Sequence, residues 1–250
     1  MFDILKIMKH QGKQFIPDPT AVTLPPQHPG KPVIDDKHCQ FQCASCKEIC
    51  PVNAINIAPV SLDLGKCVFC GECEAMCPSS KIKFTPDYKI ASNNSSALVV
   101  KEGINEEIKF DADKIRKEIK QCFGKSLKLR LVSAGSCNGC ELELNACGNV
   151  NFDMGRYGIE FLASPRHCDG VVVTGPIVSN STEALRLTFE AIPHPKILIL
   201  VGACAVSGGI FSESPAIQRQ FVEVHKPDLL IPGCPPHPLT FINGVLNLIK

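Results

Sequence analysis

Residues 67–84 read CVFCGECEAMCPSSKIKF, and residues 39–57 read CQFQCASCKEICPVNAINI. Each stretch places three cysteines close together, then a fourth cysteine followed by proline, and then a strand-like tail. Two such stretches in succession are an internal repeat. The second stretch keeps a strict spacing, whereas the first has one extra residue after Cys39. The repeat predicts a small module of two similar halves that share one kind of chemistry.

Cysteine is the outlier in the composition, with 15 residues in a chain of 250. The N-terminus, MFDILKIMKHQGKQF, lacks the apolar core and the cleavage site of a signal peptide, so we expect reduced thiols and metal binding rather than disulfides. A net charge of +1, no Trp and 6% aromatic residues argue against nucleic acid as a partner. No apolar run has the length of a transmembrane helix. We expect the first sixteen residues to form a helix that packs on its own protein.

The cysteine spacing favours an iron–sulfur module over a pair of structural zinc sites, which use C-x2-4-C pairs. The repeat resembles the two-cluster bacterial-type ferredoxins, whose pattern is C-x2-C-x2-C-x3-C-P with each fourth cysteine serving the other cluster. Three thiolates so close together surround one corner of a cubane, and the repeat supplies the fourth. The resemblance covers residues 33–84. It implies one [4Fe–4S] cluster on Cys39, Cys43, Cys46 and Cys77, and a second on Cys67, Cys70, Cys73 and Cys50.

From residue 127 onward, short apolar stretches alternate with helical patterns, which predicts a parallel sheet covered by helices on both faces. The predicted strands are Leu127–Ala134, Ile159–Ala163, Gly170–Thr174, Lys196–Val201 and Asp228–Ile231; the predicted helices are Glu141–Ala146, Thr182–Ile192, Pro215–Val224 and Pro238–Ile249. Ligands of such sheets lie beyond the carboxyl ends of the strands. Four cysteines follow strands there: Cys137, Cys140, Cys204 and Cys234.

Four motifs of this region, SAGSCNGCELEL, FLASPRHCDGVVVTGP, VGACAVSGGIF and IPGCPPHP, resemble the small subunit of [NiFe] hydrogenases. They are most similar to the energy-converting, membrane-associated, formate-hydrogenlyase-like group, with the cluster-bearing subunit of complex I as a more distant relative. The resemblance covers residues 127–250. It implies a flavodoxin-like domain with a proximal [4Fe–4S] cluster on Cys137, Cys140, Cys204 and Cys234. The motif Cys137-Asn138-Gly139-Cys140 is the one that hydrogenases carry, whereas complex I subunits carry adjacent cysteines at this position.

Other residues carry weaker signals. Glu141 follows Cys140, and the resemblance puts it near a subunit interface, where it would either relay protons or act as a helix N-terminal acid. Arg166 and His167 match a family motif near the proximal cluster, with a structural role favoured for His167. Twelve cysteines are assigned to three clusters, which leaves Cys122, Cys147 and Cys168 as small hydrophobic residues. The sequence contains no motif that supports a flavin site, a nucleotide site or a Ser-His-Asp site.

The resemblance therefore implies an α/β protein with an N-terminal α+β ferredoxin domain. We expect an arm and Pro-rich linker at 1–32, the two-cluster domain at 33–88, a connector with one helix at 89–126, and the hydrogenase-like domain at 127–250. That helix contains Ile115, Ile119 and Cys122, with Asp111 or Asp113 as its N-cap.

The implied function is an oxidoreductase subunit that relays electrons between its clusters and a nickel–iron site on a partner large subunit, where protons and H2 interconvert. Further partners would be other hydrogenase subunits, including membrane subunits, and a ferredoxin or dehydrogenase as donor, at a cytoplasmic peripheral arm. The alternatives are a complex I-like quinone or carrier oxidoreductase and a redox or assembly scaffold without turnover.

Overall fold

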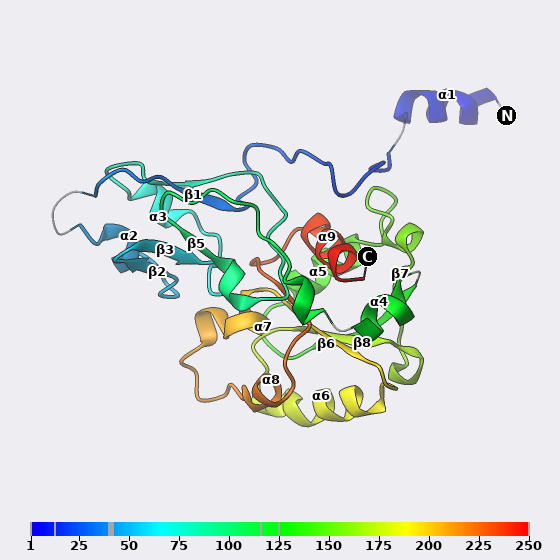
Figure 1. The fold of residues 1–250 in the computed structure, drawn as a ribbon. Helices are drawn as coiled ribbons and strands as arrows, with labels where there is room; N and C mark the ends of the chain where they lie inside the picture. The colour runs from blue at the N-terminus through cyan, green and yellow to red at the C-terminus, as the bar shows by residue number, and fades with distance from the viewer. Residues whose placement is uncertain (1, 13, 40–42, 116, 125, 250) are drawn as a thin grey trace.

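The structure is a computed structural model that describes residues 2–12, 14–39, 43–115, 117–124 and 126–249. It has a ferredoxin-like part at one end and a sheet-and-helix part at the other, with an N-terminal helix that projects away from both (Figure 1). No helix in these ranges is long and apolar enough to cross a membrane.

The ferredoxin-like part consists of short strands and two one-turn helices, β1 (Pro32–Ile34), α2 (Ser45–Glu48), β2 (Ile55–Ile57), β3 (Val60–Asp63), α3 (Glu72–Ala75) and β4 (Ile82–Phe84). Strands β1 and β4 pair antiparallel, and β2 pairs antiparallel with β3. The segment predicted as a connector adds β5 (Val99–Lys101), which pairs antiparallel with β3 and makes a three-stranded sheet. This part of the chain is therefore α+β, as predicted.

The C-terminal part contains the parallel sheet that the apolar runs predict. Its strands are β6 (Leu127–Ser133), β7 (Ile159–Phe161), β8 (Gly170–Thr174), β9 (Ile197–Val201) and β10 (Leu229–Ile231). Their order across the sheet is β10-β9-β8-β6-β7, and every pair is parallel. Numbered within the sheet, this is the 2-1-3-4-5 order of the flavodoxin-like folds. The flavodoxin-like prediction is confirmed.

Both faces of this sheet are covered. Helices α4 (Lys117–Phe123), α5 (Gly139–Ala146) and α9 (Pro238–Ile249) pack on one face with Val172, Ile199 and Ile231. Helices α6 (Ser179–Ala191) and α8 (Gln220–Val224) pack on the other with Val171 and Val173, and Figure 1 shows α9 and α6 on opposite sides. Neighbouring valines of one strand thus serve opposite layers, because side chains alternate across a strand.

The buried cluster on the α6 face continues into the ferredoxin-like part. It joins Leu62, Leu64 and Leu98 to Ala134 and Ala205, so one apolar core spans both parts of the chain. Burial of this shared apolar surface fixes how the cysteine-bearing loops of the two parts lie relative to each other.

Three predictions about single residues and helix ends are wrong. Helix α8 begins at Gln220 rather than at Pro215, since the residues before it form turns that hydrogen-bond back to the sheet part, for example Gln218 N–H to Ile177 O at 2.8 Å. Cys122 lies on α4 but is exposed, because Ile119 and Phe123 are the residues that face the core. Asp111 caps a short 3-10 turn ahead of α4, through a bond from Asp113 N–H at 3.2 Å.

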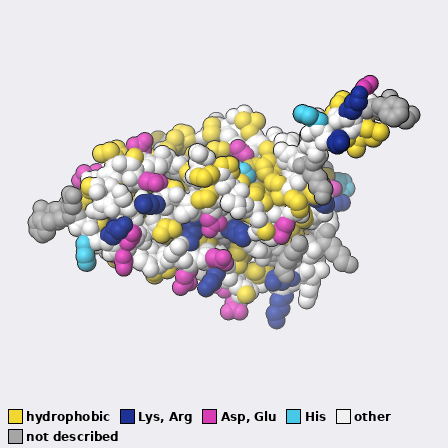
Figure 2. Space-filling model, turned by 90° about the horizontal axis from the view of Figure 1, so that it is seen from above, with side chains coloured by type: hydrophobic (Ala, Val, Ile, Leu, Met, Phe, Trp, Pro, Cys, Tyr) yellow, Lys and Arg dark blue, Asp and Glu magenta, His cyan; other side chains and the backbone are white. Residues whose placement is uncertain are grey.

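A fourth error concerns α1 (Phe2–Gln11), which does not pack on its own protein. Its apolar side chains are exposed, with Ile4 and Met8 each at 64%. In Figure 2 the helix stands clear of the body, over which acidic and basic side chains are interspersed. The linker after it does pack, since Leu24 is buried with Tyr88 and Leu239, and the Tyr88 hydroxyl donates to Pro19 O at 2.6 Å.

Candidate iron–sulfur sites

The first thiol group lies at the β2 and β4 ends of the ferredoxin-like part. One pocket is lined by four cysteines, Cys39, Cys43, Cys46 and Cys77. Burial raises the pKa of the Cys46 thiol, and the nearby thiols of Cys77, Cys39 and Cys43 raise it further. The backbone N–H of Lys81 donates to Cys77 Sγ at 3.2 Å. Cys77, from the second half of the repeat, thus lies with three cysteines of the first half.

The second thiol group is the reciprocal set. A second pocket is lined by Cys50, Cys67, Cys70 and Cys73. Burial, with a smaller contribution from neighbouring cysteines that include Cys50, raises the pKa of both Cys67 and Cys73 to about 12. Two backbone N–H groups donate to sulfur at 3.3 Å, Ala54 to Cys50 and Phe69 to Cys67.

The third thiol group lies at the carboxyl edge of the parallel sheet. Cys137 and Cys140 follow β6, Cys204 lies on α7 (Ala203–Ser207) directly after β9, and Cys234 follows β10. Burial raises the pKa of Cys140 to about 12 together with smaller contributions from Glu141, Cys204, Cys234 and Cys137. The topology therefore brings together four cysteines that lie far apart in the sequence.

Glycine makes this third group sterically feasible. Gly202 has φ of +87°, and a Cβ at its position would lie 2.5 Å from Cys140 Sγ. Gly175 has φ of +78°, and a Cβ there would lie 2.1 Å from Gly135 O, where the loops after β6 and β8 cross. Side chains at these two positions would collide with the loops that carry the thiols.

The chemistry of the donor sets fits iron–sulfur clusters. All three groups consist of four thiols, and the buried ones have raised pKa values, which means that they ionise readily only when a cation compensates the thiolate charge. Backbone N–H groups that donate to cysteine sulfur are the usual outer partners of such clusters. Within the described ranges, no group of three or more His, Cys, Asp and Glu side chains could hold a single metal ion.

Glu141 occupies the first turn of α5. Its Oε1 accepts a hydrogen bond from Thr174 Oγ1 at 2.7 Å, and Thr174 is fully buried. Its Oε2 is buried without a hydrogen-bond partner. An unpartnered buried carboxylate oxygen beside Cys140 is costly, so this position is specified by something besides packing. A proton-relay role for Glu141 stays a prediction.

The remaining predicted residues fall into two classes. Arg166 and His167 lie on an exposed 3-10 turn, Pro165–His167, beyond the end of β7. Cys147 and Cys168 are buried, at 0% and 1% exposure, and their thiols donate to the backbone oxygens of Glu143 and Ser164. These two cysteines behave as small core residues, as predicted.

Sequence reasoning missed two charged residues near the thiols. Lys81, only 4% exposed, lines the cavity of the first group. Arg219 holds α7, because its guanidinium donates to the backbone oxygens of Cys204, Ala205 and Val206 at 3.3, 2.7 and 2.8 Å. Lys81 could have been found from the sequence by its position four residues after Cys77, which is followed by proline. No sequence signal marked Arg219.

Comparisons with known proteins agree with this architecture. Residues 137–248 match the family described as NADH ubiquinone oxidoreductase, 20 Kd subunit, and residues 60–80 match a 4Fe-4S binding domain. The probable membrane-bound hydrogenase subunit mbhJ of Pyrococcus furiosus is 38% identical, over 51% of this chain and 77% of that protein. An NADH-quinone oxidoreductase subunit of Bacteroides thetaiotaomicron is 35% identical, over 67% of this chain and 84% of that protein.

A chain in the solved structure of the membrane-bound sulfane sulfur reductase, an archaeal respiratory membrane complex, is 27% identical. It aligns over 52% of this chain and 72% of its own, with a TM-score of 0.46. The family match and the relatives confirm the predicted resemblance. This chain belongs to the family of the complex I 20-kDa subunit and the hydrogenase subunits related to it, and it is a [4Fe–4S]-binding electron-transfer subunit of an oxidoreductase.

Proposed function

We propose that this chain relays electrons within a [NiFe] hydrogenase complex, between an external donor or acceptor and a nickel–iron site on a partner large subunit. The observation that carries the proposal is the set of three four-thiol groups in one chain, the third of them in a domain shared with the Pyrococcus furiosus hydrogenase subunit. The hydrogenase-like motif Cys137-Asn138-Gly139-Cys140 supports a hydrogenase over a complex I-like oxidoreductase.

The proposed cofactors are three [4Fe–4S] clusters, which supply one-electron transfer when bound. Their ligands would be Cys39, Cys43, Cys46 and Cys77; Cys50, Cys67, Cys70 and Cys73; and Cys137, Cys140, Cys204 and Cys234. The protein's own contribution is to hold the thiolates and to donate N–H groups to their sulfurs. It also shields two thiols of the second group from water, since Cys67 and Cys73 are only 7% and 6% exposed.

Packing between the two parts supports an order for the path. Gly65, two residues before Cys67, lies against Val206, two residues after Cys204: a Cβ on Gly65 would be 3.1 Å from Val206 Cγ1. Phe69 and Cys234 line one cavity at the same junction. The Cys50 and Cys67 group is therefore the middle site, and the Cys39 and Cys77 group is the outer one.

The proposed organisation follows the predicted boundaries, with an arm and linker at 1–32, a two-cluster module at 33–88, a connector at 89–126 and the partner-facing domain at 127–250. The proposed partners are the large subunit, other hydrogenase subunits that include membrane subunits, and a ferredoxin or dehydrogenase as donor. The proposed place is the cytoplasmic peripheral arm of a membrane-associated complex.

The test is hydrogen isotope exchange, D2 against H2O, on the native complex isolated through a tag on this chain. We expect exchange, together with about twelve cluster iron atoms per copy of this chain, four for each cluster, besides the iron of the partner subunits. A complex with that iron content and no exchange would contradict the hydrogenase proposal.

A complex I-like oxidoreductase is the second candidate, favoured by the Bacteroides thetaiotaomicron relative, which aligns with more of this chain. It predicts electron transfer to a quinone or another carrier by the same complex, without exchange. Two C-x2-C pairs in the neighbouring large-subunit sequence would decide for nickel and iron.

A further inference from the structure

The two halves of the ferredoxin-like repeat differ at one structurally equivalent position. Ala54 lies four residues after Cys50 and donates its N–H to that sulfur at 3.3 Å. Lys81 lies four residues after Cys77 and donates its N–H to that sulfur at 3.2 Å. The same backbone contact is thus made twice, once by a residue with a neutral side chain and once by a residue with a cationic one.

The Lys81 side chain lies inside the protein beside the outer site. It is 4% exposed and lines the cavity formed by Cys39, Cys43, Cys46 and Cys77. Its ammonium group donates to Lys37 O at 2.7 Å and to Glu102 Oε2 at 2.5 Å. Burial disfavours the ammonium form, but the hydrogen bond to Glu102 and the carboxylate charge outweigh it and raise the pKa of Lys81. The positive charge is therefore permanent near neutral pH.

The charge of Cys39 is among those that act on the Lys81 ammonium group. Glu102 is 31% exposed, whereas Lys81 is 4% exposed, so water screens the carboxylate more strongly than the ammonium group. Asp35 and Lys37 form a solvent-exposed pair at 2.8 Å, which water screens, and His38 lies near Glu102. The cavity of the middle site is lined by the acidic Glu72 and, within the described residues, by no lysine or arginine.

Charge beside a redox group shifts its potential. A cluster becomes more negative when it takes up an electron, so a fixed positive charge at short range stabilises the reduced form and raises the reduction potential. The effect is larger where water is excluded, because screening is weaker there.

We propose that Lys81, held in place by Glu102, raises the reduction potential of the outer cluster above that of the middle cluster. This inference rests on the proposed function, in that both sites hold [4Fe–4S] clusters. Each cluster accepts one electron from a one-electron donor, and the first electron to enter the module resides at the outer site. Transfer inward to the middle site is then the uphill step, so the outer site stores the electron until the inner sites accept it.

The test is an EPR-monitored redox titration of the intact complex with dithionite as reductant, for the wild type and five variants, of which two assign the signals and three test the charge. The outer signal is assigned as the one absent from Cys43→Ala, and the middle signal as the one absent from Cys70→Ala. Lys81→Met keeps the aliphatic stem and removes the charge. Lys83→Met is the matched control, since Lys83 lies on the same strand β4 but is exposed. Glu102→Gln removes the opposing charge and leaves the ammonium group.

We expect Lys81→Met to reduce the share of the first electron at the outer cluster on the order of tenfold, which is about 59 mV for a one-electron couple. Lys81→Met should thus lower the reduction potential of the outer cluster. Glu102→Gln should raise that potential, and Lys83→Met should leave it unchanged. A merely structural role of this ion pair would not produce shifts in reduction potential of opposite sign when its two members are replaced.

Unchanged potentials in Lys81→Met, or shifts of the same sign in Lys81→Met and Glu102→Gln, would overturn the inference. If Lys81→Met fails to assemble, Glu102→Gln alone still tests it. Iron content distinguishes failure of the proposed function from failure of the inference about Lys81. Absent clusters in the wild type refute the proposed function, whereas clusters with unaltered potentials refute only the role of Lys81.

Discussion

Cys50 and Cys77 occupy the same position in the two halves of the repeat, and each lies with the three thiols of the opposite half. This exchange ties the halves together, because neither site is complete without both. The same residues determine stability and redox chemistry, since a missing ligand leaves the other three thiolates of its site without a complete ligand set.

Replacement of Cys77 by Ala should therefore remove the cluster on Cys39, Cys43 and Cys46, although Cys77 belongs to the other half of the repeat. We expect a loss of about four of twelve iron atoms per chain. The measurement is iron content with EPR spin quantification. Cys122→Ala is the control, because Cys122 is exposed on α4. Loss of the Cys67 signal instead would contradict the crossed assignment.

Gly202 is the second residue whose replacement is decisive. In Gly202→Ala the new Cβ meets Cys140 Sγ at 2.5 Å in a backbone conformation with φ of +87°. We expect the third cluster to be lost or distorted while the two ferredoxin-like clusters are retained, as their separate EPR signals would show. Gly148→Ala is the control, since a Cβ there would lie 3.5 Å from Asn145 O. An unperturbed third signal in Gly202→Ala would refute this steric role.

At the scale of elements, α7 is the weakest part of the third site. It has five residues and carries Cys204, and a helix this short has little stability of its own. Arg219 supplies what the sequence of α7 lacks, by donating to three carbonyl oxygens at its end. Burial lowers the pKa of Arg219, yet a guanidinium stays charged in proteins.

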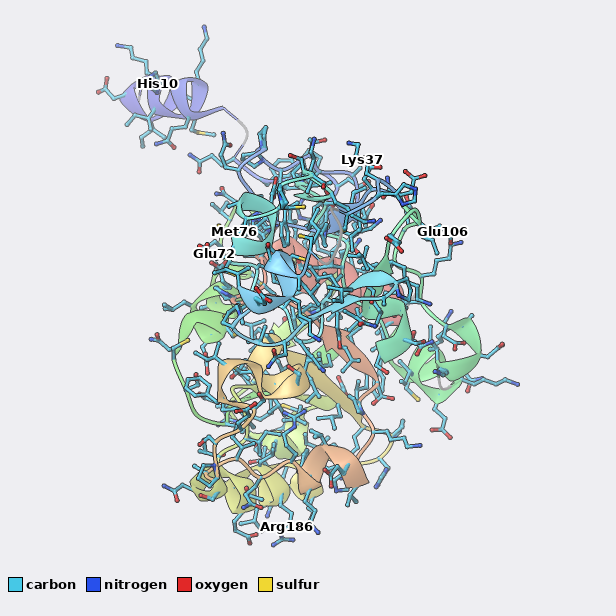
Figure 3. The ribbon with its side chains drawn as sticks, turned by 90° about the vertical axis from the view of Figure 1, so that its left-hand side faces the viewer. His10, Lys37, Glu72, Met76, Glu106 and Arg186 are labelled. Carbon is cyan, nitrogen blue, oxygen red and sulfur yellow. The ribbon has the colours of Figure 1, made fainter. Side chains whose placement is uncertain are left out.

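Arg219→Met should destabilise the fold by about 1–3 kcal/mol, because three backbone acceptors lose a charged donor. It should also make the third cluster the first to be lost on heating. Thermal unfolding followed by absorbance of the clusters measures both effects. The matched control is Arg186→Met on α6, far from the ferredoxin-like end (Figure 3), where the guanidinium pairs with exposed Glu183 and Glu190. Equal destabilisation by the two variants would refute the specific role of Arg219.

Over the whole molecule, the linker joins the two ends of the chain. His28 lies edge-on to His237 at 5.2 Å between ring centroids, and Phe152 contacts His237 at 5.6 Å. Burial, with His28 adding to it, lowers the pKa of His237 from 6.5 to about 4, and burial lowers the pKa of His28 as well. Both rings are therefore neutral in the folded protein near pH 7.

The stability of this junction should depend on pH. The unfolded chain takes up protons at these histidines below pH 6.5, whereas folded His237 does so only near pH 4, so the free energy of unfolding falls as the pH is lowered from about 6.5 to about 4. Urea unfolding midpoints at about pH 7.5, 6 and 5 measure the slope. His237→Asn should flatten it, and His10→Asn on exposed α1 should not. An unaltered slope in His237→Asn would rule out this linkage.

The sequence by itself determined the architecture and the grouping of the thiols. Five apolar runs predicted the five strands of the parallel sheet, because buried parallel strands need continuous apolar stretches. The resemblance to two-cluster ferredoxins, which the cysteine spacing carries, implied the two crossed sets, and the structure brings those same residues together. Such signals are local in the sequence, so they can be recognised without knowledge of the fold.

Only the tertiary structure decided what depends on contacts between distant segments. Strand β5 has three residues and exists because β3 offers it a partner. The exposure of Cys122 and the failure of α1 to pack depend on which neighbours are present, and periodicity does not reveal that. The contact of Gly65 with Val206 and the burial of Lys81 with Glu102 likewise arise from packing. Spacing along the chain predicts which residues are ligands, whereas the order of the sites and the charge beside each depend on how the parts pack together.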